Sequence, residues 1–246
     1  TFIMKRLFIV GIGPGNKENM SMEAMDAMES SHILVGYTKY IQLVKSLFPE
    51  KEVFTNGMKQ EVDRCRKAME LANEGKTVAM ICSGDAGVYG MAGPLCQLSP
   101  EYPEVEIVVV PGITAALSGA AVLGAPLTHD FAVISLSDLM TPWEKIEQRL
   151  ACASEADFCI AIYNPSSRKR ADYLQKACQI MMKYKSPETI CGTVQNIGRQ
   201  GQTSEIMTLD ELQYRDTDMF TTVFIGNSST EIINGRMVTP RGYKID

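Results

Sequence analysis

Short β-like runs alternate with helical patterns along the first half of the sequence, and this alternation constrains the fold more than any other feature. Apolar runs lie at residues 7–10, 32–35, 77–82 and 105–110, and helical patterns lie near 21–30, 39–48 and 60–73. Runs 77–82 and 105–110 each lead through glycines into a further helical stretch rich in small residues. Strands that alternate with helices form βαβ units, whose strands are parallel. We therefore predict an α/β domain with a mainly parallel sheet.

A second α/β set begins after the stretch Ala-Pro-Leu-Thr-His-Asp at 125–130. It contains strand-like runs at 131–136, 158–163, 189–194 and 220–225, helical patterns near 143–151 and 168–182, and a glycine-punctuated tail typical of antiparallel strands. At roughly 150 residues per domain, 246 residues fit one to two domains. We predict an N-terminal domain at 1–127 and a C-terminal domain with a mixed sheet at 128–246. Thr1, Phe2 and Ile3 precede Met4 and are left out of the argument.

One predicted helix has a clear start signal. Thr141 is the expected N-cap, Pro142 occupies the first helical position, and Glu144 follows three residues after the cap. This pattern is typical of a capping box, in which the two polar side chains satisfy backbone N–H groups at the helix start.

Charge and hydropathy exclude two classes of partner. The formal net charge is −5, with 24 basic and 29 acidic residues, and binding to nucleic acid requires a broad basic face. No apolar run approaches the ~20 residues that a membrane-spanning helix needs. We expect no nucleic-acid partner and no membrane anchor.

The seven cysteines stand at 65, 82, 96, 152, 159, 178 and 191, without any Cys-x-x-Cys pair. Only His32 and His129 add imidazole groups, so no zinc-type ligand spacing can be assembled and we predict no metal site. An odd number of unpaired thiols indicates reduced, mostly buried cysteines in a cytoplasmic protein.

The first strand-like run leads into the glycine-rich turn Gly11-Ile-Gly-Pro-Gly15. It fails the dinucleotide-binding fingerprint, because Asn16 stands at the third glycine position and Gly36-Tyr37 stands where an acidic ribose partner is expected. Pro14 also lacks the N–H group that a phosphate cradle uses. The turn therefore points away from nicotinamide and nucleotide-phosphate binding.

Two further glycine turns, 83–90 and 111–116, follow the third and fourth predicted strands. In a parallel sheet all three turns lie at the carboxyl edge, where open α/β sheets bind ligands. Glycine lets a ligand approach the backbone, and Asp85 offers acceptors to hydroxyl or amino groups. For each residue taken singly there is a structural alternative, in which Asp85 is an N-cap and Thr114 a turn residue. The three turns together favour a pocket.

Three motifs resemble the tetrapyrrole (uroporphyrin-III C/precorrin) methyltransferase family: Val10–Gly15 (VGIGPG), Gly84–Gly90 (GDAGVYG) and Pro111–Ala115 (PGITA). Further stretches resemble the branch that acts on precorrin-3B or cobalt-precorrin-3 at C-17, namely 84–94, 129–131, 135–139, 141–143, 163–165 and 238–243. The resemblance spans essentially the whole chain. It implies two α/β domains with a cofactor cleft between them, S-adenosyl-L-methionine as methyl donor, a homodimer, and methylation of C-17 with contraction of the macrocycle to the precorrin-4 level.

The resemblance also assigns cofactor contacts, and these are Pro14, Ser83, Gly84, Asp85, Val88, Thr114, Ala115, Tyr163, Asn164, Ile197 and Thr222. Two positions depart from the family pattern. The usual Gly-Asp-Pro reads Gly84-Asp85-Ala86, which affects the rigidity of the turn more than the ligand. Tyr37 stands where some relatives carry a proton-handling aspartate, so that role does not transfer.

Proton transfer and substrate binding need other residues. His129 and Asp138 are the predicted catalytic residues, with Asp130 and Ser137 as neighbouring polar candidates. A structural histidine and a loop-orienting aspartate are the alternatives. A precorrin carries many carboxylates, and we predict that Arg168 and Arg170, beside Lys169, bind them; a solvated helix start is the alternative.

Two other functions remain open at this stage. One is a tetrapyrrole methylase that acts at another ring carbon. The other is a module that binds S-adenosylmethionine without transferring its methyl group.

Overall fold

The computed structural model describes residues 4–246, so Thr1–Ile3 lie outside the described residues. The chain divides into two compact units, Thr1–Thr114 (unit 1) and Ala115–Asp246 (unit 2). The division falls before the helix that follows the fifth strand, whereas the sequence placed the boundary after this helix. The helix joins unit 2 because its Gly119 lies directly against Phe224 of that unit.

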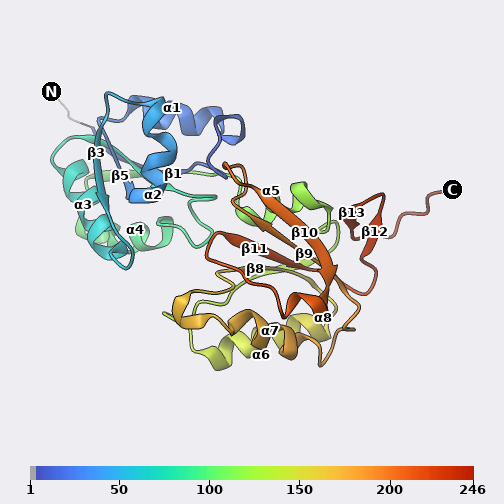
Figure 1. Cartoon of the computed structure of the whole chain (residues 1–246). Helices are drawn as coiled ribbons and strands as arrows, with labels where there is room; N and C mark the ends of the chain where they lie inside the picture. The colour runs from blue at the N-terminus through green and yellow to red at the C-terminus, as the bar shows by residue number, and fades with distance from the viewer. Residues whose placement is uncertain (1–3) are drawn as a thin grey trace. The chain divides into compact units, whose positions relative to one another are not determined.

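Unit 1 is built on a five-stranded sheet (Figure 1). Its strands are β1 (Lys5–Gly11), β2 (Ile33–Tyr37), β3 (Glu52–Asn56), β4 (Thr77–Cys82) and β5 (Val105–Val110). Their order is β3-β2-β4-β1-β5, and every neighbouring pair is parallel. The predicted parallel sheet is confirmed.

Helices cover both faces of this sheet. They are α1 (Met22–Ser30), α2 (Thr38–Val44), α3 (Glu61–Asn73) and α4 (Ala92–Leu98), with short 3-10 turns at Lys17–Asn19, Lys45–Leu47 and Ser99–Glu101. Side chains alternate along β1, because successive residues of a strand point to opposite faces. Leu7 and Ile9 pack with α3 and α4, whereas Val10 packs with α1 and α2.

Unit 2 has a mixed sheet, as predicted. Its strands are β7 (Phe131–Ser135), β8 (Cys159–Tyr163), β9 (Ile190–Gln195), β10 (Thr203–Thr208) and β11 (Thr221–Ile225), in the order β10-β9-β11-β8-β7. Only β7 and β8 are parallel; the other neighbours are antiparallel. A second, small sheet joins β6 (Gly124–Ala125) to the hairpin of β12 (Glu231–Ile233) and β13 (Arg236–Val238).

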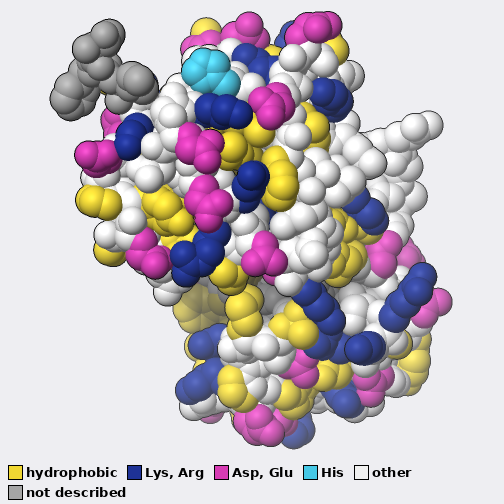
Figure 2. All heavy atoms as spheres, turned by 90° about the vertical axis from the view of Figure 1, so that its left-hand side faces the viewer, with side chains coloured by type: hydrophobic (Ala, Val, Ile, Leu, Met, Phe, Trp, Pro, Cys, Tyr) yellow, Lys and Arg dark blue, Asp and Glu magenta, His cyan; other side chains and the backbone are white. Residues whose placement is uncertain are grey.

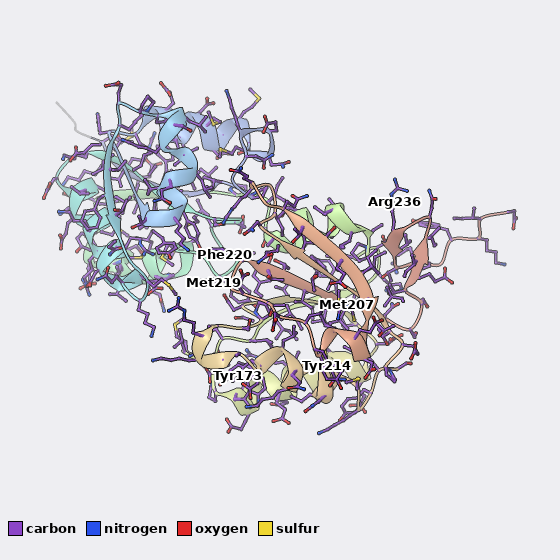
Figure 3. All side chains as sticks on the ribbon, viewed as in Figure 1. Tyr173, Met207, Tyr214, Met219, Phe220 and Arg236 are labelled. Carbon is purple, nitrogen blue, oxygen red and sulfur yellow. The ribbon has the colours of Figure 1, made fainter. Side chains whose placement is uncertain are left out.

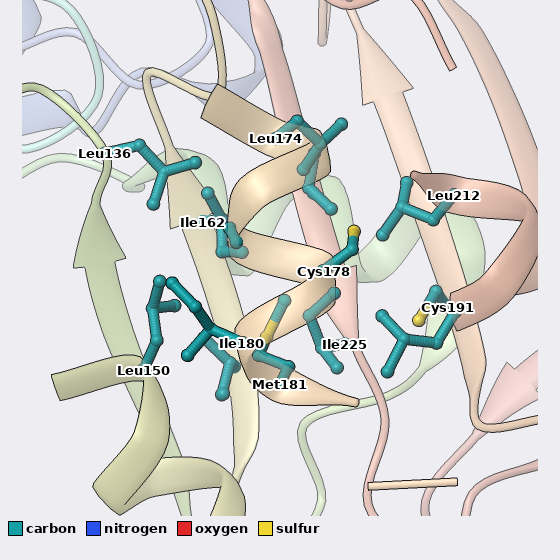
Figure 4. Close-up of a cluster of buried hydrophobic side chains, with 14 of the residues drawn as sticks. Leu136, Leu150, Ile162, Leu174, Cys178, Ile180, Met181, Cys191, Leu212 and Ile225 are labelled. Atoms are coloured by element: carbon teal, nitrogen blue, oxygen red, sulfur yellow. The ribbon is translucent and has the colours of Figure 1, made fainter. Parts of the chain in front are cut away.

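The helices of unit 2 are α5 (Ala115–Leu123), α6 (Trp143–Glu155), α7 (Tyr173–Met181) and α8 (Leu209–Leu212), with a 3-10 turn at Arg168–Arg170. Figure 4 shows the core under α6 and α7, where Leu150, Leu174 and Met181 meet Ile162 and Ile225 of the sheet. Helix α5 packs on the opposite face against Phe224.

The predicted capping box at Thr141 is wrong. The N-cap of α6 is Pro142, whose ψ of 142° is extended, and no side chain caps the helix. Because the helix begins one residue later than predicted, Lys145 takes the third helical position and Glu144 is out of register. A complete capping box occurs instead at α8, where Thr208 and Glu211 satisfy each other's backbone N–H groups.

The surface carries charges of both signs (Figure 2). Basic and acidic side chains are interspersed on the face shown in Figure 2, without a continuous basic stripe on that face. Within residues 4–246, no helix combines the length and the apolar character that crossing a bilayer requires.

Candidate functional site

The three glycine turns of unit 1 are joined to one another at the carboxyl edge of its sheet. Strands β4, β1 and β5 are neighbours, so the turns that follow them lie side by side. Gly13 and Gly84 exchange two backbone hydrogen bonds, of 3.0 and 2.8 Å between nitrogen and oxygen. The N–H of Ile12 donates to the carbonyl of Cys82 at 3.0 Å. The turns after β1 and β4 therefore form one connected platform.

Asp85 ties the third turn to this platform. Its Oδ1 accepts a hydrogen bond from the N–H of Gly112 at 2.9 Å, and its Oδ2 accepts one from Gly87 at 2.8 Å. The sequence suggested that this carboxylate binds a ligand directly. The structure shows that each oxygen already has a backbone partner, so Asp85 sets the positions of the loops.

Glycine is required at this platform because the loops approach each other closely. A Cβ added to Gly112 would lie 2.3 Å from the carbonyl oxygen of Gly84, and one on Gly11 would lie 2.7 Å from the same atom. By contrast, a Cβ on Gly87 would meet only Asp85 Oδ2, at 3.3 Å. The inner glycines serve the packing of the loops, and the backbone around the exposed Gly87 has space beside it.

The other predicted cofactor residues of unit 1 belong to the same three turns. Pro14 is buried, while Ser83, Val88 and Thr114 are half-buried. Sequence reasoning did not single out Tyr89, which is 56% exposed and has a φ of +54°, a strained value for a residue with a side chain. Its position between Gly87 and Gly90 was the available signal.

The predicted cofactor residues of unit 2 meet at one edge of its sheet. Tyr163 ends β8, Ile197 follows the end of β9, and Thr222 lies near the start of β11. Because β11 runs antiparallel to both β8 and β9, its beginning lies beside their ends. The topology thus gathers Tyr163, Asn164, Ile197 and Thr222.

Helix α5 begins at this same edge. The Tyr163 hydroxyl oxygen accepts a hydrogen bond from the N–H of Ala116 at 2.7 Å, in the first turn of α5 beside Ala115. Asn164 has a φ of +51°, and its Nδ2 donates to Ser135 Oγ at 3.0 Å, which links the loops after β7 and β8. The start of α5 and these loops are therefore positioned by side chains.

Asp138, a predicted catalytic residue, is held by two partners. Arg170 Nε donates to its Oδ1, and the Tyr173 hydroxyl donates to its Oδ2 at 2.6 Å; Figure 3 labels Tyr173 on α7. These bonds, first from Tyr173 and then from Arg170, lower the pKa of Asp138 below its ordinary value. The carboxylate is ionised at neutral pH and has no proton to donate.

His129 lies at the other end of β7 from Asp138. Its Nδ1 accepts from the N–H of Asp130 at 2.8 Å, and its Nε2 lies 3.3 Å from Arg241 Nη1. The five residues of β7 separate the two predicted catalytic residues by roughly 15 Å. The structure does not bring His129 and Asp138 together.

The two predicted substrate-binding arginines differ. Arg170 is paired with Asp138 and is half-buried. Arg168 is exposed and makes no ion pair with any residue between 4 and 246. Of the two, Arg168 has the charge that is available to a ligand.

Comparison with known proteins identifies the family. The family model of the tetrapyrrole (corrin/porphyrin) methylases matches residues 6–213. The chain belongs to the tetrapyrrole methylases. A Salmonella typhimurium protein named "probable cobalt-factor III C(17)-methyltransferase" is 45% identical, over 97% of this chain and 100% of that protein. A precorrin-3B C(17)-methyltransferase of Sinorhizobium is 37% identical, over 96% of both proteins.

A solved structure supports the same assignment. The crystal structure of the methyltransferase CobJ superimposes with a TM-score of 0.88, at 32% identity, and covers 95% of this tetrapyrrole methylase and 99% of the CobJ chain. The fold predicted from the sequence is therefore that of the family.

Proposed function

We propose that this tetrapyrrole methylase transfers a methyl group from S-adenosyl-L-methionine to C-17 of precorrin-3B or cobalt-precorrin-3, with ring contraction to the precorrin-4 level. The observation that carries the proposal is full-length similarity to relatives that are named for C-17 methylation. The greater identity to the cobalt-factor III relative, 45% against 37%, favours a cobalt-containing substrate.

The sulfonium of the cofactor supplies a methyl group that is already electrophilic. The protein must then hold donor and acceptor in line, and positioning of this kind contributes roughly 7–11 kcal/mol to lowering a barrier. General acid–base catalysis contributes less, typically 10²–10⁴-fold. The joined glycine turns and the side-chain-fixed loops of this chain fit a site that works by shape and backbone contacts.

The cofactor contacts are assigned to two sets of residues. In unit 1 they are the turns that contain Pro14, Ser83, Gly84, Asp85, Val88 and Thr114, where the space beside Gly87 and the interlocked loops suit a bound nucleoside. In unit 2 they are Ala115, Tyr163, Asn164, Ile197 and Thr222. Asp85 acts as a positioning residue in this scheme.

Asp138 and Arg170 are proposed to shape the loop after β7, since each neutralises the other. Arg168 is proposed to contact a substrate carboxylate. The catalytic role of His129 stays a prediction, and replacing His129 by Gln tests it: retained turnover would exclude a general base at this position.

Incubation of the protein with methyl-labelled S-adenosylmethionine and a panel of precorrins, with and without cobalt, tests the function. We expect label in one product, located at C-17 by NMR. Label at another ring carbon would instead establish a different regiospecificity. Binding of the cofactor without labelled product from any precorrin would indicate a non-catalytic module.

We further propose that the enzyme is a homodimer in the cytoplasm. The dimer is implied by the family resemblance, and the reducing compartment is favoured by seven free thiols, five of them buried. Sedimentation velocity at micromolar concentration tests the dimer, and a single species of about 27 kDa would exclude it.

A further inference from the structure

Arg64 is a buried cation without an acidic partner. It lies in the first turn of α3 and is 4% exposed. Among residues 4–246, no carboxylate oxygen lies within 4.0 Å of its guanidinium. Burying an unpaired charge is costly, so buried arginines are normally paired. This arginine is not used by the proposed cofactor contacts.

The guanidinium is fixed by neutral groups. Arg64 Nε donates to Asn56 Oδ1 at 2.8 Å, and its Nη2 donates to the carbonyl of Gly57 at 3.0 Å. The Tyr37 ring lies beneath it, with 5.7 Å between ring centroid and Cζ. These contacts orient the side chain without neutralising it.

One edge of the guanidinium is open. Nη1 of Arg64 has no hydrogen-bond partner among the described residues. Within that range, Ser154 Oγ is the one side-chain polar atom that is both fully buried and without a partner, so Nη1 cannot be fully buried. Nη1 therefore reaches the surface. An oriented guanidinium with free N–H groups matches the geometry of a carboxylate.

The location connects Arg64 to the candidate site of unit 1. Tyr37 ends β2 and Asn56 ends β3, so the guanidinium lies at the same carboxyl edge as the glycine turns. Burial raises the pKa of the Cys82 thiol, at the end of β4, to about 12; the charge of Asp85 adds to this rise and that of Arg64 opposes it with the smallest effect, so Arg64 lies within electrostatic range of this strand end. Ligands of parallel α/β sheets bind at this edge.

We propose that Arg64 binds a carboxylate of a ligand of the enzyme, supplied either by the tetrapyrrole substrate or by the amino-acid part of the cofactor. The inference rests on the proposed function for the identity of these ligands. The buried cation is compensated when the carboxylate binds.

Two variants separate this role from a purely structural one. R64M removes the cation. N56D places a carboxylate beside Arg64 Nε. This carboxylate neutralises the charge of Arg64 inside the protein and still accepts the hydrogen bond from Nε. R66Q is the matched control, because Arg66 lies on the same helix but is 45% exposed and paired with Glu101.

Binding is measured by calorimetry with S-adenosylhomocysteine and with 5′-methylthioadenosine, which lacks the amino-acid part, and by fluorescence titration with uroporphyrin as a polycarboxylate tetrapyrrole. We expect R64M and N56D to weaken one carboxylate ligand about tenfold or more, and R66Q to weaken none. Loss confined to S-adenosylhomocysteine identifies the cofactor carboxylate as the source, and loss confined to uroporphyrin identifies the substrate.

N56D keeps the inference falsifiable where R64M fails to fold. If N56D retains its melting temperature and binds all three ligands like the wild type, Arg64 is structural and the inference is overturned. These titrations need no turnover, so they stand apart from the methyl-transfer assay; absence of methyl transfer by the wild type contradicts the proposed function alone.

Discussion

Two aspartates of this protein act as connectors between loops. Asp85 accepts hydrogen bonds from backbone N–H groups of two turns. Asp138 accepts hydrogen bonds from Arg170 and Tyr173, which follow it in the sequence by 32 and 35 residues. The sequence marked both carboxylates as functional. It did not reveal their partners, because contacts across such separations depend on the fold and not on local pattern. The same applies to Arg64. Helix α3 is rich in charged residues, and nothing in its sequence indicates that this arginine is buried.

Replacing Asp85 by Ala is expected to lower stability by about 1–3 kcal/mol, since two backbone N–H groups lose their acceptor. Cofactor affinity should fall as well, because the turn at Gly112 is released. Urea unfolding and calorimetry with S-adenosylhomocysteine measure the two effects. Unchanged affinity of D85A for S-adenosylhomocysteine would show that Asp85 does not contribute to the cofactor site.

Asp138 gives the protein a pH-dependent stabilisation. Its pKa is lowered from 3.8 in the folded protein, so its contribution is complete above the unfolded pKa and disappears as pH falls through the folded pKa. D138N should melt about 2–4 °C below the wild type at pH 7, and the difference should shrink as the pH is lowered below 3.8.

D172N is the control for this series, because Asp172 forms an exposed i,i+4 pair with Lys176 and should change the melting temperature little. A difference between D138N and the wild type that stays constant from pH 7 down to the acid limit would contradict the assignment.

Helices and strands differ in how clearly the sequence defines them. The runs 77–82 and 105–110 match β4 and β5 at both ends. Strand β4 lies between two other strands, and such a strand is typically a continuous apolar run. Strand β5 lies at an edge, but five of its six residues are apolar. Strand β3 was missed because its sequence, EVFTN, holds only two apolar residues, neither of them fully buried, and so gives no apolar run. The start of α6 was misplaced because sequence alone does not give the ψ of Pro142.

Two glycines in neighbouring elements should respond oppositely to alanine. In G112A the new Cβ would lie 2.3 Å from the Gly84 carbonyl, so the turn must shift and we expect a loss of about 1–3 kcal/mol together with weaker cofactor binding. In G93A the Cβ meets nothing within 4 Å, and alanine in α4 should stabilise by about 0.5–1 kcal/mol. Chemical denaturation of both variants checks the signs; equal effects would contradict the interlocked turns.

The hydroxyl group of Tyr163 accepts a hydrogen bond at the start of α5. Y163F removes the acceptor of the Ala116 N–H and should cost about 0.5–1.5 kcal/mol in unfolding free energy. Cofactor affinity, measured by calorimetry, should fall with it because the first turn of α5 carries Ala115. A variant with normal affinity would show that this helix start does not contact the cofactor.

For the whole molecule, the sequence predicted an α/β fold with one parallel and one mixed sheet, and this is what the topology shows. The mostly buried thiols were also predicted: of the seven cysteines, only Cys96 and Cys152 are exposed. The assignment of α5 to the first domain followed from its position after a strand. Its packing against Phe224 was invisible because that residue lies a hundred positions further along.

Thiol titration of the native protein at pH 8 should therefore find two fast cysteines and five that react only on unfolding. Burial supports this outcome doubly, since it blocks the reagent and raises the pKa of Cys65 to about 11 and of Cys178 to about 12. A C96S/C152S variant serves as the control and should show no fast reaction. Three or more fast thiols in the wild type would contradict the buried core.

Strand order has a consequence for synthesis on the ribosome. All strands of the first sheet lie between Lys5 and Val110, so its hydrogen-bonding partners are all present before half of the chain has been translated. In the second sheet β8 waits for β11, which ends roughly 60 residues later. At about 5–20 residues per second, that edge of the nascent chain stays unpaired for roughly 3–12 s. In the first sheet β1 waits still longer for its neighbour β5, which ends roughly 100 residues after it. The N-terminal half is thus the part of the polypeptide with the longer exposure to misassociation, and a slower translation rate would lengthen this exposure in both halves.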